Sequence, residues 1–410
     1  MKIENSMPPR SAPSLSSQIN LTNQKLIHIG AGLAAVILFK LLLDILSLNV
    51  SEIADTPKCP FCYGEELCPI IQNNSIITNP SFLDRIIFYV NTKKPIRGYM
   101  NNQDVVIKKL ASSSEFKDLD RFICDKFFSH SNSTECFSKP LKYFAALNHI
   151  YQSRNVSDKL VYCGGDSFPD VMNILKIPDE KHSPTDRIFQ YWTQVKLNPE
   201  PLLLQILKSE EGWPVPKYFG SCGRLIVVEH CGKDLAEFLY APLPVRMNLT
   251  LQVLDLATNF TFGHKDYAFY FTDISPINLV VDQKHRVRLV DLEHVIISNK
   301  KSSKGSSGKK RNLDTPHLSE HIECNDCLAF STDKICEHSI SDHNFYAVCK
   351  EIFGPSTLMP GGFLHSPSEC LKTTPPGLSF LMNNCIQPSG NSTRLQTVED
   401  LKNLIKKCQL

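Results

Sequence analysis

The chain has 410 residues, of which 42% are apolar, and a formal net charge of +2 at pH 7. This length and apolar content suffice for one large two-lobed domain with a terminal appendage, so they exclude a wholly disordered chain. The near-neutral charge excludes a strongly basic surface for nucleic acid and an acidic excess for storing cations, and we expect no nucleic-acid partner.

The N-terminal part of the chain combines a polar tail with an apolar stretch. Residues 1–25 are polar, contain scattered Pro and Ser and lack a repeating apolar pattern, which predicts a disordered cytosolic tail. Residues 26–48 are mostly apolar, and a helix of this length spans a hydrocarbon core of roughly 30 Å. Lys40 and Asp44 interrupt the stretch at i,i+4 spacing, where they can pair or reach toward the interface. We expect a transmembrane or signal-anchor helix, with a cleaved signal peptide as the alternative.

The charges that flank this apolar stretch predict the orientation of the chain. Lys2, Arg10 and Lys25 precede it, whereas Glu52 and Asp55 follow it. The positive charge on the first side places the N-terminus in the cytosol and the rest of the chain in the lumen. The expected location is the Golgi or endoplasmic reticulum, as a single-pass type II membrane protein, or outside the cell if the anchor is cleaved.

Cysteine placement agrees with this orientation. All 15 cysteines lie after the apolar stretch, from Cys59 to Cys408. In an oxidising lumen this usage predicts disulfides, with one cysteine left over. Zinc is the alternative, because Cys59 with Cys62 and Cys324 with Cys327 have the C-x-x-C spacing of a zinc site.

Glycosylation triplets point to the same compartment. An N-x-Ser/Thr triplet on the proposed lumenal side begins at each of Asn73, Asn132, Asn155, Asn248, Asn259 and Asn391. Together with the cysteines, these triplets predict a secretory-pathway glycoprotein.

The rest of the chain has the pattern of an α+β fold with two lobes. Residues 86–90 and 105–107 are β-branched and aromatic, which predicts strands, and residues 115–128 have the apolar spacing of an amphipathic helix. We divide this part into a Cys-rich lumenal stem, a small lobe with a helical insertion, and a large lobe with a Cys-rich C-terminal part, at residues 49–79, 80–227 and 228–410.

Three polar residues have the spacing of the catalytic and metal-binding residues of a protein kinase. Asn278 follows Asp273 by five positions, and Asp291 follows the strand-like residues 287–290. In such a site Asp273 accepts or orients the substrate hydroxyl, while Asn278 and Asp291 hold Mg²⁺ or Mn²⁺. The alternative for the first pair is a turn in which the Asp and Asn side chains cap backbone groups.

The small lobe must supply a cation for the phosphates of ATP. Val105–Lys108 matches the Val-Ala-Ile-Lys strand of kinases, in which the Lys faces the α- and β-phosphates and a helix Glu holds it. Glu115 is the nearest candidate for that Glu, although the gap of seven residues is shorter than usual. The alternative is a strand that ends in two solvated lysines, Lys108 and Lys109.

A second buried strand is expected at Leu225–Glu229, and Cys231 and Gly232 end it. In a kinase this strand continues into the hinge, whose backbone groups hydrogen-bond the adenine ring. Val228 would then stand at the gate of the pocket, and Glu229 and Cys231 would contact the nucleotide.

Several segments resemble one family. With the loops of Asp273 and Asp291, they look like the divergent protein kinase domain family, in the branch of the deleted-in-autism proteins, which is related to the family with sequence similarity 69. The segments are Asn198–Pro201, Glu211–Pro214, Lys217–Gly220, Cys222–Arg224 and Ser341–Cys349. The resemblance covers about residue 80 to the C-terminus and implies a disulfide-bearing, secretory-pathway kinase fold. It gives Lys108, Asp273, Asn278 and Asp291 the roles described above, and it makes Asp342 the buried acid that braces the catalytic loop.

The chain also departs from the kinase pattern. Thr272 stands where the Arg of His-Arg-Asp is usual, and Glu293 stands where Asp-Phe-Gly has its Gly. No G-x-G-x-x-G sequence precedes Lys108, so the phosphates must be covered in another way.

Three functions follow as hypotheses. In the first, the chain is a lumenal kinase that phosphorylates a secreted or lumenal protein or glycan. In the second, it is a pseudokinase that acts as a signalling or binding module. The third is a membrane-tethered or shed ligand for a receptor, in which only the disulfide-stabilised fold matters.

Overall fold

The computed structural model describes residues 50–78, 95–127, 159–163, 184–301 and 328–409, except for short gaps at 74, 356–358 and 390–391, together with a few isolated positions such as Lys93, 304–305 and 308–309. The strand expected at 86–90 and most of the apolar stretch at 26–48 lie outside the described residues. Within the described residues, no helix is long and apolar enough to cross a membrane.

The first part of the fold is a five-stranded antiparallel sheet with the order β1-β2-β3-β6-β5. Its strands are β1 (Ile77–Thr78), β2 (Ile96–Met100), β3 (Gln103–Lys108), β5 (Tyr218–Cys222) and β6 (Leu225–Glu229). The expected strands at 105–107 and Leu225–Glu229 are confirmed. Asn101 and Asn102 both have positive φ, 48° and 63°, which fits the tight turn between β2 and β3.

Helices flank this sheet. They are α2 (Val50–Ile53), the 3₁₀ turns η1 (Thr56–Lys58) and η3 (Ser209–Glu211), α3 (Cys68–Gln72), α5 (Ser113–Phe127), α9 (Pro184–Leu197) and α10 (Glu200–Ile206). Helix α5 confirms the amphipathic helix expected at 115–128. It begins in a capping box, because Ser112 Oγ accepts from the Glu115 N–H at 3.2 Å and Glu115 Oε2 accepts from the Ser112 N–H at 2.7 Å.

The described part of residues 49–79, which were expected to form a stem, packs directly against the sheet. Cys68 forms a disulfide with Cys222 of β5, and Ile71 and Ile76 are buried beside the sheet residues Val105 and Val227.

The second part of the fold is mostly helical and, among the described residues, carries three small sheets. Its helices are the 3₁₀ turn η4 (Leu235–Phe238), α11 (Leu243–Thr258), the π-turn η5 (Asn259–Gly263), α12 (Thr332–Glu337), α13 (His343–Val348), the π-turn η6 (Cys349–Phe353), α14 (Glu369–Thr373), α15 (Leu378–Ile386) and α16 (Arg394–Cys408). Its strands are β4 (Val161–Cys163), β7 (Lys233–Asp234), β8 (Tyr267–Phe271), β9 (Leu279–Val281), β10 (Val287–Leu289), β11 (Val295–Asn299), β12 (Lys304–Gly305) and β13 (Gly308–Lys309).

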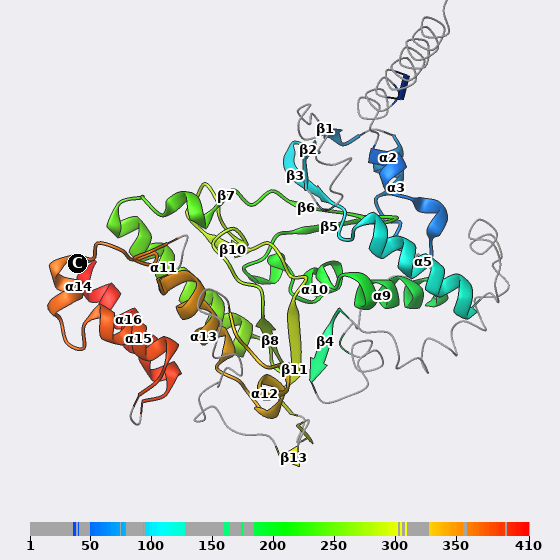
Figure 1. Cartoon of the computed structure of the whole chain (residues 1–410). Helices are drawn as coiled ribbons and strands as arrows, with labels where there is room; N and C mark the ends of the chain where they lie inside the picture. The colour runs from blue at the N-terminus through cyan, green and yellow to red at the C-terminus, as the bar shows by residue number, and fades with distance from the viewer. Residues whose placement is uncertain are drawn as a thin grey trace, which may run out of the picture.

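The two parts lie at opposite ends of the molecule, with the β1–β3 strands at one end and α14, α15 and α16 at the other (Figure 1). Strands β8, β9 and β10 lie between these ends and carry the loops that the sequence analysis singled out. The largest hydrophobic cluster runs through both parts, and it includes Val228 of the first sheet, Leu279 and Leu289 of the loop strands, and Phe345 of α13. This shared core fixes the loops relative to the first sheet.

Disulfides fasten the fold at several points. The bonds are Cys59–Cys62, Cys68–Cys222, Cys163–Cys336, Cys349–Cys385 and Cys370–Cys408, and Cys124 is also disulfide-bonded. The prediction of disulfides is confirmed for these cysteines. Cys59 and Cys62, which also had zinc-site spacing, are bonded to each other. Cys231 is the free cysteine among the described residues, and Cys324 and Cys327 lie outside them.

Candidate active site

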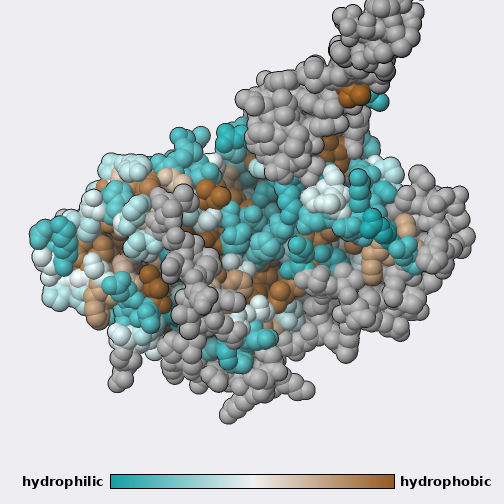
Figure 2. Space-filling view, in the orientation of Figure 1, coloured by the Kyte–Doolittle hydropathy of each residue, from teal (hydrophilic) through white to brown (hydrophobic). Residues whose placement is uncertain are grey.

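A cavity of about 570 Å³ lies where the first sheet meets the helical part. Its walls include Lys108, Val228, Glu229, Cys231, Asn278 and Asp291, so the structure brings together six of the eight residues predicted for the site. Asp273 and Glu115 are not among the lining residues. The side chains over the middle of the molecule are mainly hydrophilic on the face seen in Figure 2.

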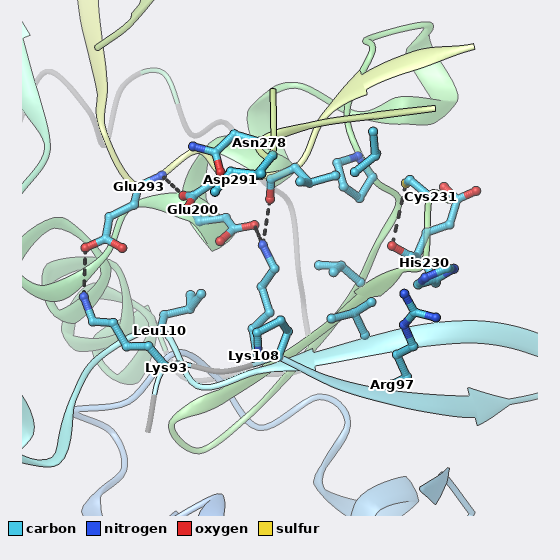
Figure 3. A pocket seen from close by; sticks show the side chains of 18 of the residues that line it. Lys93, Arg97, Lys108, Leu110, Glu200, His230, Cys231, Asn278, Asp291 and Glu293 are labelled. Carbon is cyan, nitrogen blue, oxygen red and sulfur yellow. Dashed lines mark hydrogen bonds and ion pairs between the residues drawn. The ribbon is translucent and has the colours of Figure 1, made fainter. Parts of the chain in front are cut away.

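Lys108 forms a buried ion pair inside this cavity. It extends from the end of β3, and its Nζ lies 2.6 Å from Glu200 Oε1 and 2.6 Å from the carbonyl oxygen of Val290 (Figure 3). The Glu200 side chain is only 2% exposed. Burial raises the pKa of Glu200 to about 7, although the Lys108 ammonium acts to lower it. Lys108 is therefore held by a helix Glu, as a kinase-like site requires.

The predicted pairing of Lys108 with Glu115 is wrong. Glu200, the first residue of α10, takes that place. Asn198 positions it, because Asn198 Oδ1 accepts from the Glu200 N–H at 2.9 Å and Asn198 Nδ2 donates to the Leu110 carbonyl at 3.1 Å. The Asn-Pro-Glu-Pro sequence was the available signal, but Glu200 lies 92 positions after Lys108, and this separation hid the pair.

Glu115 instead binds two other lysines. Its carboxylate lies 3.5 Å from Lys93 Nζ and 3.7 Å from Lys159 Nζ. Burial acts to raise the pKa of Glu115, but the hydrogen bonds from Ser112 and the two ammonium groups lower it overall. Glu115 is thus an ionised residue at the N-terminal turn of α5.

The end of β6 and the residues that follow it form one wall of the cavity. Val228 is 1% exposed, and Glu229 Oε2 lies 2.6 Å from Arg288 Nη1 of β10, which ties this segment to the loop strands. Neither the backbone N–H nor the carbonyl of Cys231 has a hydrogen-bond partner among the residues that the structure describes. Burial and the nearby Glu229 carboxylate raise the pKa of the Cys231 thiol to about 12, so Cys231 is a neutral thiol. Its free backbone groups suit a flat ligand with donor and acceptor edges.

Gly232 lets the chain pass close to β9 where it runs from this wall into the helical part. Its φ is +119°, and a Cβ at this position would lie 2.2 Å from the carbonyl oxygen of Val281. Only glycine fits without moving the backbone of β9.

The loop of Asp273 follows β8, and side chains of α13 bond the backbone at the end of this strand. His343 Nε2 bonds the Phe271 carbonyl at 2.9 Å, and Asn344 Oδ1 accepts from the Phe271 N–H at 3.2 Å. Burial lowers the pKa of His343 to about 4, so the ring is neutral. Thr272 donates from its N–H and Oγ1 to the His294 carbonyl, at 2.9 and 3.1 Å. The Asp273 side chain is left exposed.

Asp342 opens α13, as expected, and forms a buried ion pair with Arg394 of α16. The bonds to the backbone of Phe271 come from the next two residues, His343 and Asn344, which the sequence analysis did not single out. Their positions directly after Asp342 were the available signal.

Asn278 and Asp291 lie side by side at the cavity, above the Lys108 ammonium in Figure 3. Asn278 Nδ2 donates to the Asp273 carbonyl at 3.1 Å, and Asp291 Oδ1 accepts from the Glu293 N–H at 3.0 Å. Asn278 Oδ1 and Asp291 Oδ2 accept no hydrogen bond from the described residues. These hard oxygen atoms fit Mg²⁺ or Mn²⁺.

This donor set is small for a protein-only metal site. Among the described residues, no group of three His, Cys, Asp or Glu side chains could hold a metal ion. Mg²⁺ usually takes one or two carboxylates and completes its shell with water and substrate phosphates. The residues present therefore fit a cation that arrives with a nucleotide.

Glu293 adds a third carboxylate to this region. Its side chain is 13% exposed, and Oε1 lies 3.3 Å from Lys93 Nζ. The charges of Asp291 and Glu293 both act to raise the pKa of Glu200. Glu200 and Glu293 are paired with Lys108 and Lys93, so Asp291 is the one of these three carboxylates that forms no ion pair with the described residues.

Comparison with known proteins finds similarity to one kinase-like family. The family model "Protein-kinase domain of FAM69" matches residues 191–388. The chain is 29% identical over 373 residues to Divergent protein kinase domain 2A of Homo sapiens, covering 84% of this chain and 85% of the human protein. The same protein from Xenopus tropicalis is 29% identical over 374 residues, with the same coverage. Divergent protein kinase domain 2B of Homo sapiens is 42% identical over 78 residues, which is 19% of this chain and 18% of that protein.

Proposed function

We propose that this chain, which belongs to the divergent protein kinase domain family, binds ATP with Mg²⁺ or Mn²⁺ and phosphorylates a lumenal or secreted substrate. The observation that carries the proposal is the Lys108–Glu200 ion pair. It lies in the same cavity as Asn278, Asp291 and the free backbone groups of Cys231.

In this proposal, different residues of the cavity bind the adenine ring, the phosphates and the divalent cation. The backbone of Cys231 and the apolar Val228 side chain receive the adenine ring, and Lys108 faces the α- and β-phosphates. Glu200 keeps Lys108 in place and charged, because a buried ammonium without a carboxylate partner would lose its proton more readily. When bound, a divalent cation held by Asn278 and Asp291 neutralises phosphate charge.

Asp273 is the residue that meets the acceptor substrate. Its exposed carboxylate is accessible to a large protein or glycan, and its main-chain carbonyl is fixed by Asn278 Nδ2 at 3.1 Å. The carboxylate orients the attacking hydroxyl and takes its proton as the phosphoryl group leaves ATP. His343 and Asn344 hold the strand that carries it.

A pseudokinase is the second candidate, and a specific observation favours it. Glu293 stands where a flexible glycine is usual and engages Lys93, and Thr272 stands where an arginine is usual. In this alternative the cavity binds nucleotide and the fold acts as a signalling module without transferring phosphate.

The location in the secretory pathway is part of the proposal. The disulfides need an oxidising compartment. Three of the glycosylation triplets begin at exposed residues of the described structure, Asn73, Asn248 and Asn259. A shift in gel mobility after removal of N-linked glycans tests this part, and replacing each of these Asn residues by Gln should remove one step of the shift. No shift in any form of the chain would contradict a lumenal location.

Phosphate transfer is tested by incubating the purified full chain with Mn²⁺ and γ-labelled ATP and locating the label by mass spectrometry. Self-labelling needs no knowledge of the natural substrate. We expect labelling of the wild type and of Asp118→Asn, an exposed control on α5, and no labelling of Asp273→Asn. Nucleotide binding without labelling would favour the pseudokinase.

A further inference from the structure

In the order of the strands along the chain, the segment between β1 and β2 corresponds to the phosphate-covering loop of a kinase. In kinases this loop is rich in glycine, so its backbone can approach the phosphates closely. Residues 79–95 of this chain contain no glycine. The site needs another group on this side of the cavity.

Lys93, near the end of this connection, lines the cavity. Its Nζ lies 3.3 Å from Glu293 Oε1 and 3.5 Å from Glu115 Oε2. Figure 3 shows Lys93 and Lys108 reaching from the same side toward the acidic residues, Lys93 toward Glu293 and Lys108 toward Glu200. Burial acts to lower the pKa of Lys93, but the two carboxylates raise it overall, so the side chain is an ammonium group.

We propose that Lys93 is a phosphate-binding residue of this cavity, which replaces the backbone contacts of a glycine loop with a side-chain cation. The inference rests on the proposed binding of ATP.

The partners of Lys93 suit such an exchange. Lys93 is 39% exposed, and Glu115 is 29% exposed, so this ion pair is solvated and weak. The triphosphate of ATP carries more negative charge than one carboxylate, and its oxygens accept short, charge-assisted hydrogen bonds. Lys93 can therefore turn from Glu115 toward the phosphates, while its ammonium stays beside Glu293, whose side chain is 13% exposed.

A purely structural role is the alternative. Through Glu115 and Glu293, Lys93 also joins α5 to the segment after Asp291, and this clamp alone could explain its position. The two roles differ in which part of the ligand they affect. A phosphate contact changes the affinity for ATP and not for adenosine, whereas a clamp changes both alike.

The test is calorimetric binding of ATP with Mg²⁺, and of adenosine, to the full chain. We expect Lys93→Met to weaken ATP binding by about 10- to 100-fold, the range of a charged hydrogen bond, and to leave adenosine binding unchanged. Lys93→Arg keeps the cation and should restore ATP affinity. Lys159→Met is the matched control: Lys159 also pairs with Glu115, at 3.7 Å, and is 42% exposed, but it does not line the cavity. We expect it to bind both ligands like the wild type.

The outcomes separate this inference from the proposed function. If the wild type binds ATP and Lys93→Met binds it equally well, or loses ATP and adenosine affinity together, Lys93 is not a phosphate contact. If the wild type binds neither ligand, the proposed function fails, and this inference fails with it.

Discussion

Glu200 Oε1 lies 2.6 Å from Lys108 Nζ, although the two residues are 92 positions apart. The contact joins the first turn of α10 to the end of β3. The buried carboxylate of the helix thus pairs with the ammonium group of the sheet, and both residues line the cavity.

The buried carboxylate of Glu200 predicts an unusual dependence of stability on pH. Its pKa is raised from 4.5 to about 7 in the folded chain. A folded pKa above the unfolded one stabilises the fold fully below pH 4.5, and this stabilisation is lost as the pH rises to about 7. Relative to that of Glu200→Gln, the free energy of unfolding of the wild type should fall by up to about 3 kcal/mol as the pH rises through this range. Urea unfolding of both proteins at several pH values measures it. A constant difference between them would contradict the assignment.

The same group predicts a pH dependence of nucleotide binding. Glu200 orients Lys108 through an ion pair, which requires the ionised carboxylate. ATP affinity should therefore rise as the pH passes through about 7 in the wild type. The rise should be absent in Glu200→Gln, which cannot ionise. Calorimetric titrations of ATP at pH values below and above 7 measure this rise. An equal rise in both proteins would show that another group is responsible.

His343 predicts the opposite pH dependence. Burial lowers its pKa from 6.5 to about 4, so the folded chain holds it neutral. Stability from this site is present above pH 6.5 and is lost as the pH falls toward 4. The loss is about 3 kcal/mol at most. His343→Gln should remove this acid-dependent part, which is read as the difference in unfolding free energy between the two proteins. Parallel pH curves would contradict the prediction.

The ion pair of Asp342 and Arg394 predicts a large effect on stability. The side chains are 3% and 1% exposed, so Asp342→Ala leaves a buried guanidinium without its carboxylate. Breaking such a pair costs about 3 to 5 kcal/mol. The exposed pair of Glu369 and Lys372, in α14, is the control, and Glu369→Ala should cost less than about 1 kcal/mol. Denaturant unfolding compares them; equal losses would mean that burial does not govern the effect.

Short-range patterns in the sequence predicted much of the fold. The strands at 105–107 and Leu225–Glu229 and the helix at 115–128 are set by local side-chain spacing, and the structure confirms them. Val228, Glu229, Asn278 and Asp291 also reach one cavity, because each lies at or next to the end of a strand whose position the shared core fixes.

Contacts between distant segments could not be predicted in the same way. The sequence favours Glu115 as the partner of Lys108 because Glu115 lies on the next helix. In the chain, however, α9 and α10 lie between α5 and β5, and α10 brings Glu200 to the cavity. Likewise, the family resemblance indicated that Asp342, which precedes α13, supports the loop of Asp273, but not that His343 and Asn344 bond the backbone of Phe271. Such bonds depend on how helices pack, which no single-sequence pattern encodes.

The most direct test is a calorimetric titration of ATP into the full chain with and without Mn²⁺, using the wild type, Asp291→Asn and the exposed control Asp118→Asn. The account predicts one ATP per chain in the wild type and the control, with affinity that depends on Mn²⁺, and loss of that dependence in Asp291→Asn. Equal ATP binding by all three proteins with and without Mn²⁺, or no binding by any, would contradict it.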